Sequence, residues 1–100
     1  MLWVTINCMI KSFGHKGLEA FHRMGQTKGV QQAHIKRLRI FLALLEAAGI
    51  VSDMETPGSG LHALRGDLQG FWSVKISGNY RLIFRFENGN AYDVDVVDYH

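Results

Sequence analysis

The hydrophobic period changes at Leu61, and this change limits what the chain can fold into. Before Leu61 the apolar residues recur at helical spacing, and after it they alternate with polar residues as in half-buried strands. Helices followed by a run of strands favour an α+β fold. We therefore expect a single domain in which an N-terminal strand and two helices pack on one face of a mainly antiparallel sheet.

Two helices are predicted in the first half of the chain. The first is a short helix over residues 15–24, with Ser12 or Gly14 as its start signal and Gly25 as its stop signal. Leu18 and Phe21 would point inward. A longer helix spans residues 31–48 and ends at Gly49. Its inward stripe has helical spacing and consists of Ile35, Leu38, Phe41 or Leu42, and Leu45. Ahead of them, residues 3–6 and 9–13 are rich in strand formers.

Three strands are predicted after the loop at residues 52–60. Their apolar faces carry Trp72, Val74 and Ile76, then Leu82, Phe84 and Phe86, then Tyr92, Val94 and Val96. A three-residue loop over residues 87–89 would pair Phe84 with Tyr92 and Leu82 with Val94, and the burial gained outweighs a preference among turn types. The same argument favours an odd-length loop around Gly78. The other face would then be exposed and cationic at its centre, with Lys75, Arg81, Arg85, Asp93 and Asp95.

The composition of the chain indicates the cellular compartment. Cys8 is alone, so no intramolecular disulfide forms and a reducing compartment is indicated. The longest apolar run, residues 40–51, contains Glu46 and is too short to cross a bilayer. The first residues lack the basic start of a secretory signal. We expect a cytoplasmic protein that does not enter a membrane.

Charge is divided unevenly between the two halves. Residues 1–52 hold seven Lys or Arg against two Glu, a net charge of +5, and residues 53–100 hold four against seven acids, a net charge of −3. Such asymmetry suggests a polyanionic partner, although solvated helix faces produce the same pattern. The basic residues of the first half are Lys11, Lys16, Arg23, Lys28, Lys36, Arg37 and Arg39.

Few motifs could carry chemistry. No close pairing of His or Cys has the spacing of metal ligands, and no phosphate loop or nucleophile elbow occurs. What remains is the segment LHALRGD, the arginines of the predicted strands and the ending Asp98-Tyr99-His100. Each has an ordinary explanation: a lone His62 is more often structural, Arg81 and Arg85 can pair with Asp93 and Asp95, and the ending can be solvated.

Taken together, several segments resemble one known family. MIKSFGHKGLEAF, AHIKRLRIFLALLEAA, LHALRGD, GFWSVKISGNYRLIFRFENGNAYDVD and the final DYH are similar, in this order, to the HigB-like killer-protein branch of the RelE superfamily of toxin–antitoxin systems. The resemblance runs from Met9 to His100. It marks residues 9–100 as a RelE-like toxin domain and residues 1–8 as an N-terminal extension.

The resemblance implies a metal-independent mRNA interferase that cleaves mRNA in the ribosomal A site, needs no cofactor and inhibits translation and growth. The implied catalytic set is His62, Arg65, Arg81, Asp98, Tyr99 and His100. Two positions depart from the family pattern: Ala63 replaces a proline, and Arg65 replaces a lysine. Because a guanidinium stays protonated, Arg65 suits a phosphate clamp but not a proton-transfer role.

In that mechanism the ribose 2′-OH attacks its own phosphate, so the protein supplies only proton carriers and fixed cations. The implied roles are acid–base catalysis for His62, Asp98 and His100, and phosphate binding for Arg65 and Arg81. Tyr99 would either stack on a base or hydrogen-bond the phosphate. Contacts to RNA or the ribosome would come from Lys11, Lys16, Arg23, Lys36, Arg37, Arg39, Lys75 and Arg85.

The implied partners are the 70S ribosome, mRNA and a cognate antitoxin. The antitoxin in this family is often a HigA-like helix-turn-helix protein. The toxin would contact operator DNA only through this antitoxin. The alternative to an enzyme is a non-catalytic subunit that binds nucleic acid or the ribosome and acts within a repressor complex with the antitoxin. A structural interaction domain is the third reading. Loss of toxicity on removing the last three residues would separate the enzyme from both.

Overall fold

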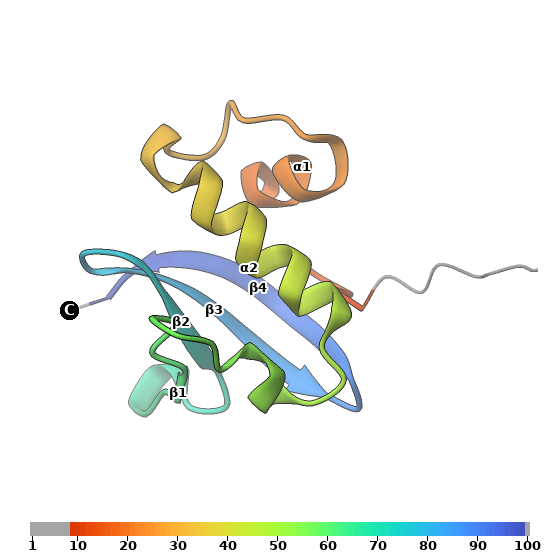
Figure 1. The fold of residues 1–100 in the computed structure, drawn as a ribbon, viewed down its shortest axis with the longest axis vertical. Coiled ribbons are helices and arrows are strands. Elements are labelled where there is room, and N and C mark those ends of the chain that lie inside the picture. The colour runs from red at the N-terminus through yellow and green to blue at the C-terminus, as the bar shows by residue number, and fades with distance from the viewer. Residues whose placement is uncertain (1–8, 100) are drawn as a thin grey trace, which may run out of the picture.

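A four-stranded antiparallel meander fills the second half of the computed structural model, which describes residues 9–99 (Figure 1). The strands follow one another in the sheet in chain order, each antiparallel to its neighbour. They are β1 (His62–Ala63), β2 (Trp72–Ser77), β3 (Tyr80–Glu87) and β4 (Asn90–Asp98). The predicted α+β class is confirmed, and LHALRGD does join the sheet through β1.

Both predicted helices are present and lie on one face of the sheet (Figure 1). They are α1 (Lys16–Met24) and α2 (Ile35–Ala47). Neither Ser12 nor Gly14 caps α1; instead, the Nδ1 of His15 accepts a hydrogen bond from the Leu18 N–H at 3.0 Å. Gly25 ends α1 in the left-handed conformation at φ 74°, as expected.

Three short 3-10 helices complete the secondary structure. They are η1 (Gln32–His34), η2 (Val51–Met54) and η3 (Gly66–Leu68). Because η1 takes up the first residues of the predicted second helix, α2 starts later than the sequence pattern indicates. The predicted loop over residues 52–60 begins inside η2, and it buries Met54 and Ser59 completely.

The core lies between the helices and one face of the sheet. The choice between Phe41 and Leu42 is settled in favour of both, because the two side chains are 3% and 1% exposed. Ile35 only borders the core. The largest fully buried side chains of this core are Ile10, Leu18, Leu38, Leu42, Leu45, Met54, Leu82 and Phe84.

The loop between β3 and β4 differs from the prediction. Glu87 pairs with Asn90, so the loop contains only Asn88 and Gly89, which have φ angles of 52° and 79°. Positive φ at both central residues is the geometry that suits the twist of a two-residue hairpin. The predicted three-residue loop is therefore wrong, although Gly89 is left-handed as expected.

A β-bulge in β4 makes the short loop compatible with a buried apolar face. Between the pairs Arg85–Tyr92 and Ile83–Asp95, the two residues Asp93 and Val94 lie opposite one residue of β3. Asp93 adopts φ 55°, a conformation that Asp tolerates better than most residues. The extra residue returns Val94 to the core face.

The bulge also changes the predicted partners. Leu82 pairs with Val96 rather than Val94, and Tyr92 pairs with Arg85 and leaves the apolar face. The β2–β3 hairpin uses the same device, since its loop is again two residues long and β2 carries one extra residue between Lys75 and Ser77. The predicted odd-length loop there is wrong. The apolar residues of β2 and β3 are nevertheless paired with one another, since Trp72 pairs with Phe84 and Val74 pairs with Leu82.

Residues 9–14 run parallel to β4 and cover its free edge. Two isolated bridges, Ile10 with Ala91 and Phe13 with Val94, replace the continuous strand that was predicted over residues 9–13. The bulge explains the interruption, because the Ser12 hydroxyl accepts a hydrogen bond from the Asp93 N–H at 2.8 Å. The predicted strand at residues 3–6 and the predicted extension lie outside the described residues.

We call the sheet face opposite the helices the second face; its central rows are His62, Ser73, Ile83 and Asp95, then Lys75, Arg81 and Val97. The prediction of an exposed centre is wrong. Ser73 is 0% exposed, and Ile83 and Leu64 are each 3% exposed. The middle of this face is therefore buried, although α1 and α2 lie on the opposite face (Figure 1).

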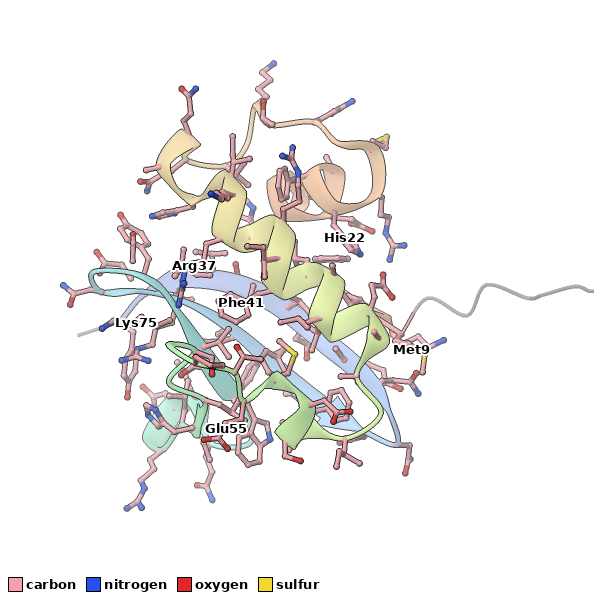
Figure 2. The ribbon with its side chains drawn as sticks, in the orientation of Figure 1. Met9, His22, Arg37, Phe41, Glu55 and Lys75 are labelled. Carbon is pink, nitrogen blue, oxygen red and sulfur yellow. The ribbon has the colours of Figure 1, made fainter. Side chains whose placement is uncertain are left out.

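A partly buried carboxylate joins the N-terminal segment to both helices. Glu46 of α2 accepts hydrogen bonds from the backbone N–H groups of Met9 at 2.7 Å and Ile10 at 3.3 Å, and its other oxygen lies 2.6 Å from Nε2 of His22 in α1. Met9 and His22 accordingly lie beside the same half of α2 (Figure 2). Burial alone would raise the pKa of Glu46, but the hydrogen bonds from His22, Met9 and Ile10 together lower it below its usual 4.5.

This lowered pKa predicts acid sensitivity. Because the folded chain holds Glu46 ionised more strongly than the unfolded chain does, its stabilisation is present above pH 4.5 and is lost as the pH falls through the lower folded pKa. We expect Glu46→Gln to lower the free energy of unfolding at neutral pH, and the gap to wild type to close below pH 4.5. Denaturant unfolding at several pH values measures this gap. A gap that does not depend on pH would contradict the role given to the carboxylate.

The start of α1 touches the loop before η1 through two glycines. A Cβ placed on Gly17 would lie 2.8 Å from the carbonyl oxygen of Gly29 and 2.9 Å from its Cα. Both neighbours are backbone atoms and cannot rotate away. The close approach of these two segments therefore requires glycine at position 17.

Gly17→Ala should consequently destabilise the fold, although alanine is the better helix former by about 1 kcal/mol. We expect a net loss of about 1–2 kcal/mol, since overpacking typically costs about 1–3 kcal/mol. Gly49→Ala is the matched control, because its Cβ would meet nothing closer than Asp53 Oδ2 at 3.9 Å. Thermal unfolding of the two variants gives the comparison. Equal melting temperatures would show that the contact yields without cost.

Candidate active site on the second face

Strand β1 presents His62 to the second face. Its partner in the register is Ser73, and residues opposite one another in an antiparallel pair share a face. The strand is only two residues long because Gly66, at φ 67°, turns the chain into η3. Arg65 stands at that turn, and both His62 and Arg65 are exposed.

The C-terminal end of β4 brings Tyr99 to the same place. The Tyr99 N–H donates a hydrogen bond to the Asn79 carbonyl at 2.8 Å, which holds the end of the chain against the β2–β3 turn, where it is seen in Figure 1. The Tyr99 ring then lies over Arg81, with 5.9 Å between the guanidinium carbon and the ring centroid. Four of the six predicted catalytic residues, His62, Arg65, Arg81 and Tyr99, thus lie in one region of the surface.

These side chains line an open groove, formed by His62, Ala63, Leu64, Arg65 and Tyr99. Its floor is apolar at Leu64, and its rim carries an imidazole, a guanidinium and a phenol. A more enclosed cavity of about 140 Å³ lies elsewhere, between α1, η1 and the sheet, where it is lined by His15, His34 and Tyr80 among others. Of these two, only the groove is lined by members of the predicted catalytic set.

One predicted member of the set, Asp98, stands apart from the groove lining. Asp98 pairs with Tyr80, whose side chain packs against the core, so strand alternation places Asp98 on the helix side of the sheet end. His100 lies outside the described residues. It follows Tyr99 directly in the sequence.

The predicted docking cations divide into those with internal partners and those in solvent. Arg37 donates to the carbonyl oxygens of Lys75 at 2.8 Å and Gly58 at 2.7 Å, and it packs over Phe41 (Figure 2). Arg37 therefore links α2 to the sheet, and its side chain is partly exposed. Arg39 lies over the ring of Phe21.

The remaining cations have simpler surroundings. Arg85 forms ion pairs with Asp93 at 3.0 Å and Glu87 at 3.5 Å, so one of the two cross-hairpin pairs considered from sequence is confirmed. Arg23 pairs with Glu19 one helical turn away. The side chains of Lys11, Lys16, Lys28, Lys36 and Lys75 are exposed.

Sequence reasoning missed one polar residue in this region. Ser73 belongs to the second face by alternation, but its complete burial cannot be predicted from the pattern. Across residues 9–99, no three His, Cys, Asp or Glu side chains gather closely enough to hold a metal ion. No helix in the same range has the length and apolar content needed to span a membrane.

Comparison with known proteins adds a family context. Residues 11–100 match the model of a family described as "RelE-like toxin of type II toxin-antitoxin system HigB". Endoribonuclease HigB of Proteus vulgaris is 38% identical over 92 residues, which cover 92% of this chain and 100% of that protein. Toxin HigB-1 of Vibrio cholerae is 33% identical over 90 residues, covering 83% of this chain and 90% of that protein.

Proposed function

Because the chain belongs to the family of RelE-like HigB toxins of type II toxin–antitoxin systems, we propose that it is an endoribonuclease that cleaves mRNA in the ribosomal A site. Cleavage there stops translation and growth until an antitoxin binds the toxin. The site of action is the 70S ribosome, which places the protein in the cytoplasm. Residues 9–100 form the toxin domain, and residues 1–8 are an extension to it.

The groove on the second face is the observation that carries this proposal. It gathers His62, Arg65 and Tyr99 on one rim, and Tyr99 in turn covers Arg81. These groups come from β1, β3 and the end of β4, so three separate segments converge on one point. RNA cleavage by an internal nucleophile requires a group that transfers protons and cations that stabilise the phosphate charge. The imidazole and the two guanidinium groups can supply these.

The proposed reaction uses the ribose 2′-OH as the nucleophile. The oxygen loses its proton and bonds to the adjacent phosphorus, the bond from phosphorus to the 5′-oxygen breaks, and that oxygen gains a proton. His62 and His100 carry the protons, and Arg65 and Arg81 stabilise the phosphate charge. Asp98, on the helix side of the sheet end, has no proton-transfer role in this reaction. Tyr99 stacks on a base next to the cleaved bond. The products are a 2′,3′-cyclic phosphate and a 5′-hydroxyl, with no metal or cofactor taking part.

Exposed cations are proposed to dock the protein on ribosomal RNA. Lys11, Lys16, Lys36 and Lys75 are the best placed, because their side chains are exposed. Docking through phosphate contacts would weaken steeply with added salt. The cognate antitoxin, proposed to be a HigA-like helix-turn-helix protein, binds operator DNA on behalf of the complex.

The decisive experiment maps mRNA ends after inducible expression of the full chain, with His100→Ala as the comparison. The proposal expects new 5′-hydroxyl ends within translated codons, lost in the variant. New ends carrying a 5′-phosphate would rule out attack by the 2′-OH. Growth arrest that persists in the variant without RNA cleavage would favour a non-catalytic ribosome-binding subunit instead.

A further inference from the structure

Two buried polar atoms on the second face have no hydrogen-bond partner within residues 9–99. They are the hydroxyl oxygen of Ser73 and the Nε of Arg81. Ser73 is 0% exposed, so water does not reach its hydroxyl from outside. Folded proteins leave few buried polar atoms without a partner, because each one loses its hydration without replacement. The presence of two on one face of one sheet needs an explanation.

The register places Ser73 and Arg81 close together on the second face, next to residues of the groove. Ser73 lies opposite His62 on one side and Ile83 on the other. Arg81 lies opposite Lys75, two residues further along β2, which makes Ser73 and Arg81 diagonal neighbours on the same face. Diagonal positions are within reach of a long side chain such as that of arginine.

The chemistry of this pair favours an anionic ligand. The Nε of Arg81 can only donate, and the Ser73 hydroxyl has a proton to offer to the same acceptor. The neighbouring carboxylates already have other partners: Asp93 accepts from Arg85 at 3.0 Å, and Asp95 accepts from the Val96 N–H at 2.8 Å. Two donors without an acceptor, in cationic surroundings, match the oxygen of a phosphate.

We propose that Ser73 Oγ and Arg81 Nε form a buried donor pair for one phosphate oxygen of the RNA backbone. This inference rests on the proposed function and adds Ser73 to the substrate-binding residues. Tyr99 lies over Arg81 in this structure, and RNA binding displaces its ring. The displacement is inexpensive, because a cation–π contact at an exposed residue is weaker than a hydrogen bond to a charged phosphate.

Ser73→Ala tests the pair in the full-length protein. We expect kcat/KM for cleavage of ribosome-bound mRNA to fall about 10- to 100-fold, the usual loss for one hydrogen bond to a charged group. The melting temperature should stay the same or rise, because the variant removes a buried hydroxyl without a partner. Activity that falls while stability holds is a result that a merely structural serine would not give.

Ser59→Ala is the matched control, since this hydroxyl is equally buried but accepts a hydrogen bond from the Thr56 N–H at 3.1 Å. Its melting temperature should fall, and its kcat/KM should equal that of wild type. The inference is overturned if Ser73→Ala cleaves RNA as fast as wild type, or if it loses activity only together with stability.

A binding measurement separates this inference from the proposed function. The probe is a fluorescent single-stranded RNA with a 2′-O-methyl group at the cleavage position, followed by anisotropy. If wild type yields no 2′,3′-cyclic ends but Ser73→Ala weakens binding about tenfold or more, the nuclease proposal fails and the phosphate subsite stands. If wild type cleaves RNA, and Ser73→Ala changes neither RNA binding nor kcat/KM, the phosphate subsite is disproved and the nuclease proposal stands.

Discussion

His62→Ala is expected to reduce mRNA cleavage by about 100- to 10,000-fold, the usual contribution of one proton-transfer group. His62 stands on the rim of the groove beside Arg65 and Tyr99, and its side chain is exposed. Removing an exposed imidazole opens no cavity, so the melting temperature should stay close to that of wild type. Quantifying 5′-hydroxyl ends on programmed ribosomes, alongside thermal unfolding, measures both effects.

His15→Ala provides the opposite signature. His15 caps α1 by accepting the Leu18 N–H, and loss of a cap typically costs about 1 kcal/mol. This variant should therefore melt earlier while its cleavage rate per folded molecule is retained. If His62→Ala kept full activity, or if the two histidine variants lost activity equally, the groove would not be the catalytic site.

Phe84→Ala is expected to produce the largest loss of stability. Phe84 is 0% exposed at the centre of the sheet, where it pairs with Trp72 and faces the helices. Truncating a buried phenylalanine typically costs about 3–5 kcal/mol. A domain of this size has only about 5–15 kcal/mol of stability in total. The variant should unfold at much lower denaturant concentration, and its toxicity should fall because less of it is folded.

Ile40→Ala is the control for this prediction. Ile40 lies on α2 but is 52% exposed, so its truncation leaves no internal cavity. We expect a change within about 0.5 kcal/mol, as for most surface substitutions. Urea unfolding of both variants gives the difference. A Phe84→Ala protein as stable as the Ile40→Ala protein would mean that the core around β3 is not packed as the structure shows.

Much of the fold could be predicted from the sequence because its signals are local. The stripe containing Leu38 and Leu45 has helical spacing, and the alternation from Trp72 to Ile76 has strand spacing. Each pattern needs only that one side of the element be buried. The placement of helices before strands, their common burial face and the left-handed Gly25 and Gly89 follow from such signals.

The hairpin registers could not be predicted in the same way. A two-residue loop at Asn88 and Gly89 puts charge into the core unless a bulge corrects it, and the sequence gives no local sign of the bulge. Asp93 holds its left-handed conformation beside Ser12, which lies 81 positions earlier in the chain. Only the folded protein brings the two together, so no window of neighbouring residues contains the information.

The candidate site, too, was predicted in part from the sequence and in part only from the tertiary structure. The resemblance of LHALRGD and DYH to one toxin family drew attention to His62, Arg65 and Tyr99 from the sequence alone. Tertiary structure decided that these residues share a groove and that Arg37 holds α2 to the sheet. It also decided that the Ser73 hydroxyl is buried near Arg81 with no hydrogen-bond partner among residues 9–99. Periodicity reports which face of an element is apolar, but burial of a polar atom depends on side chains that arrive from other strands.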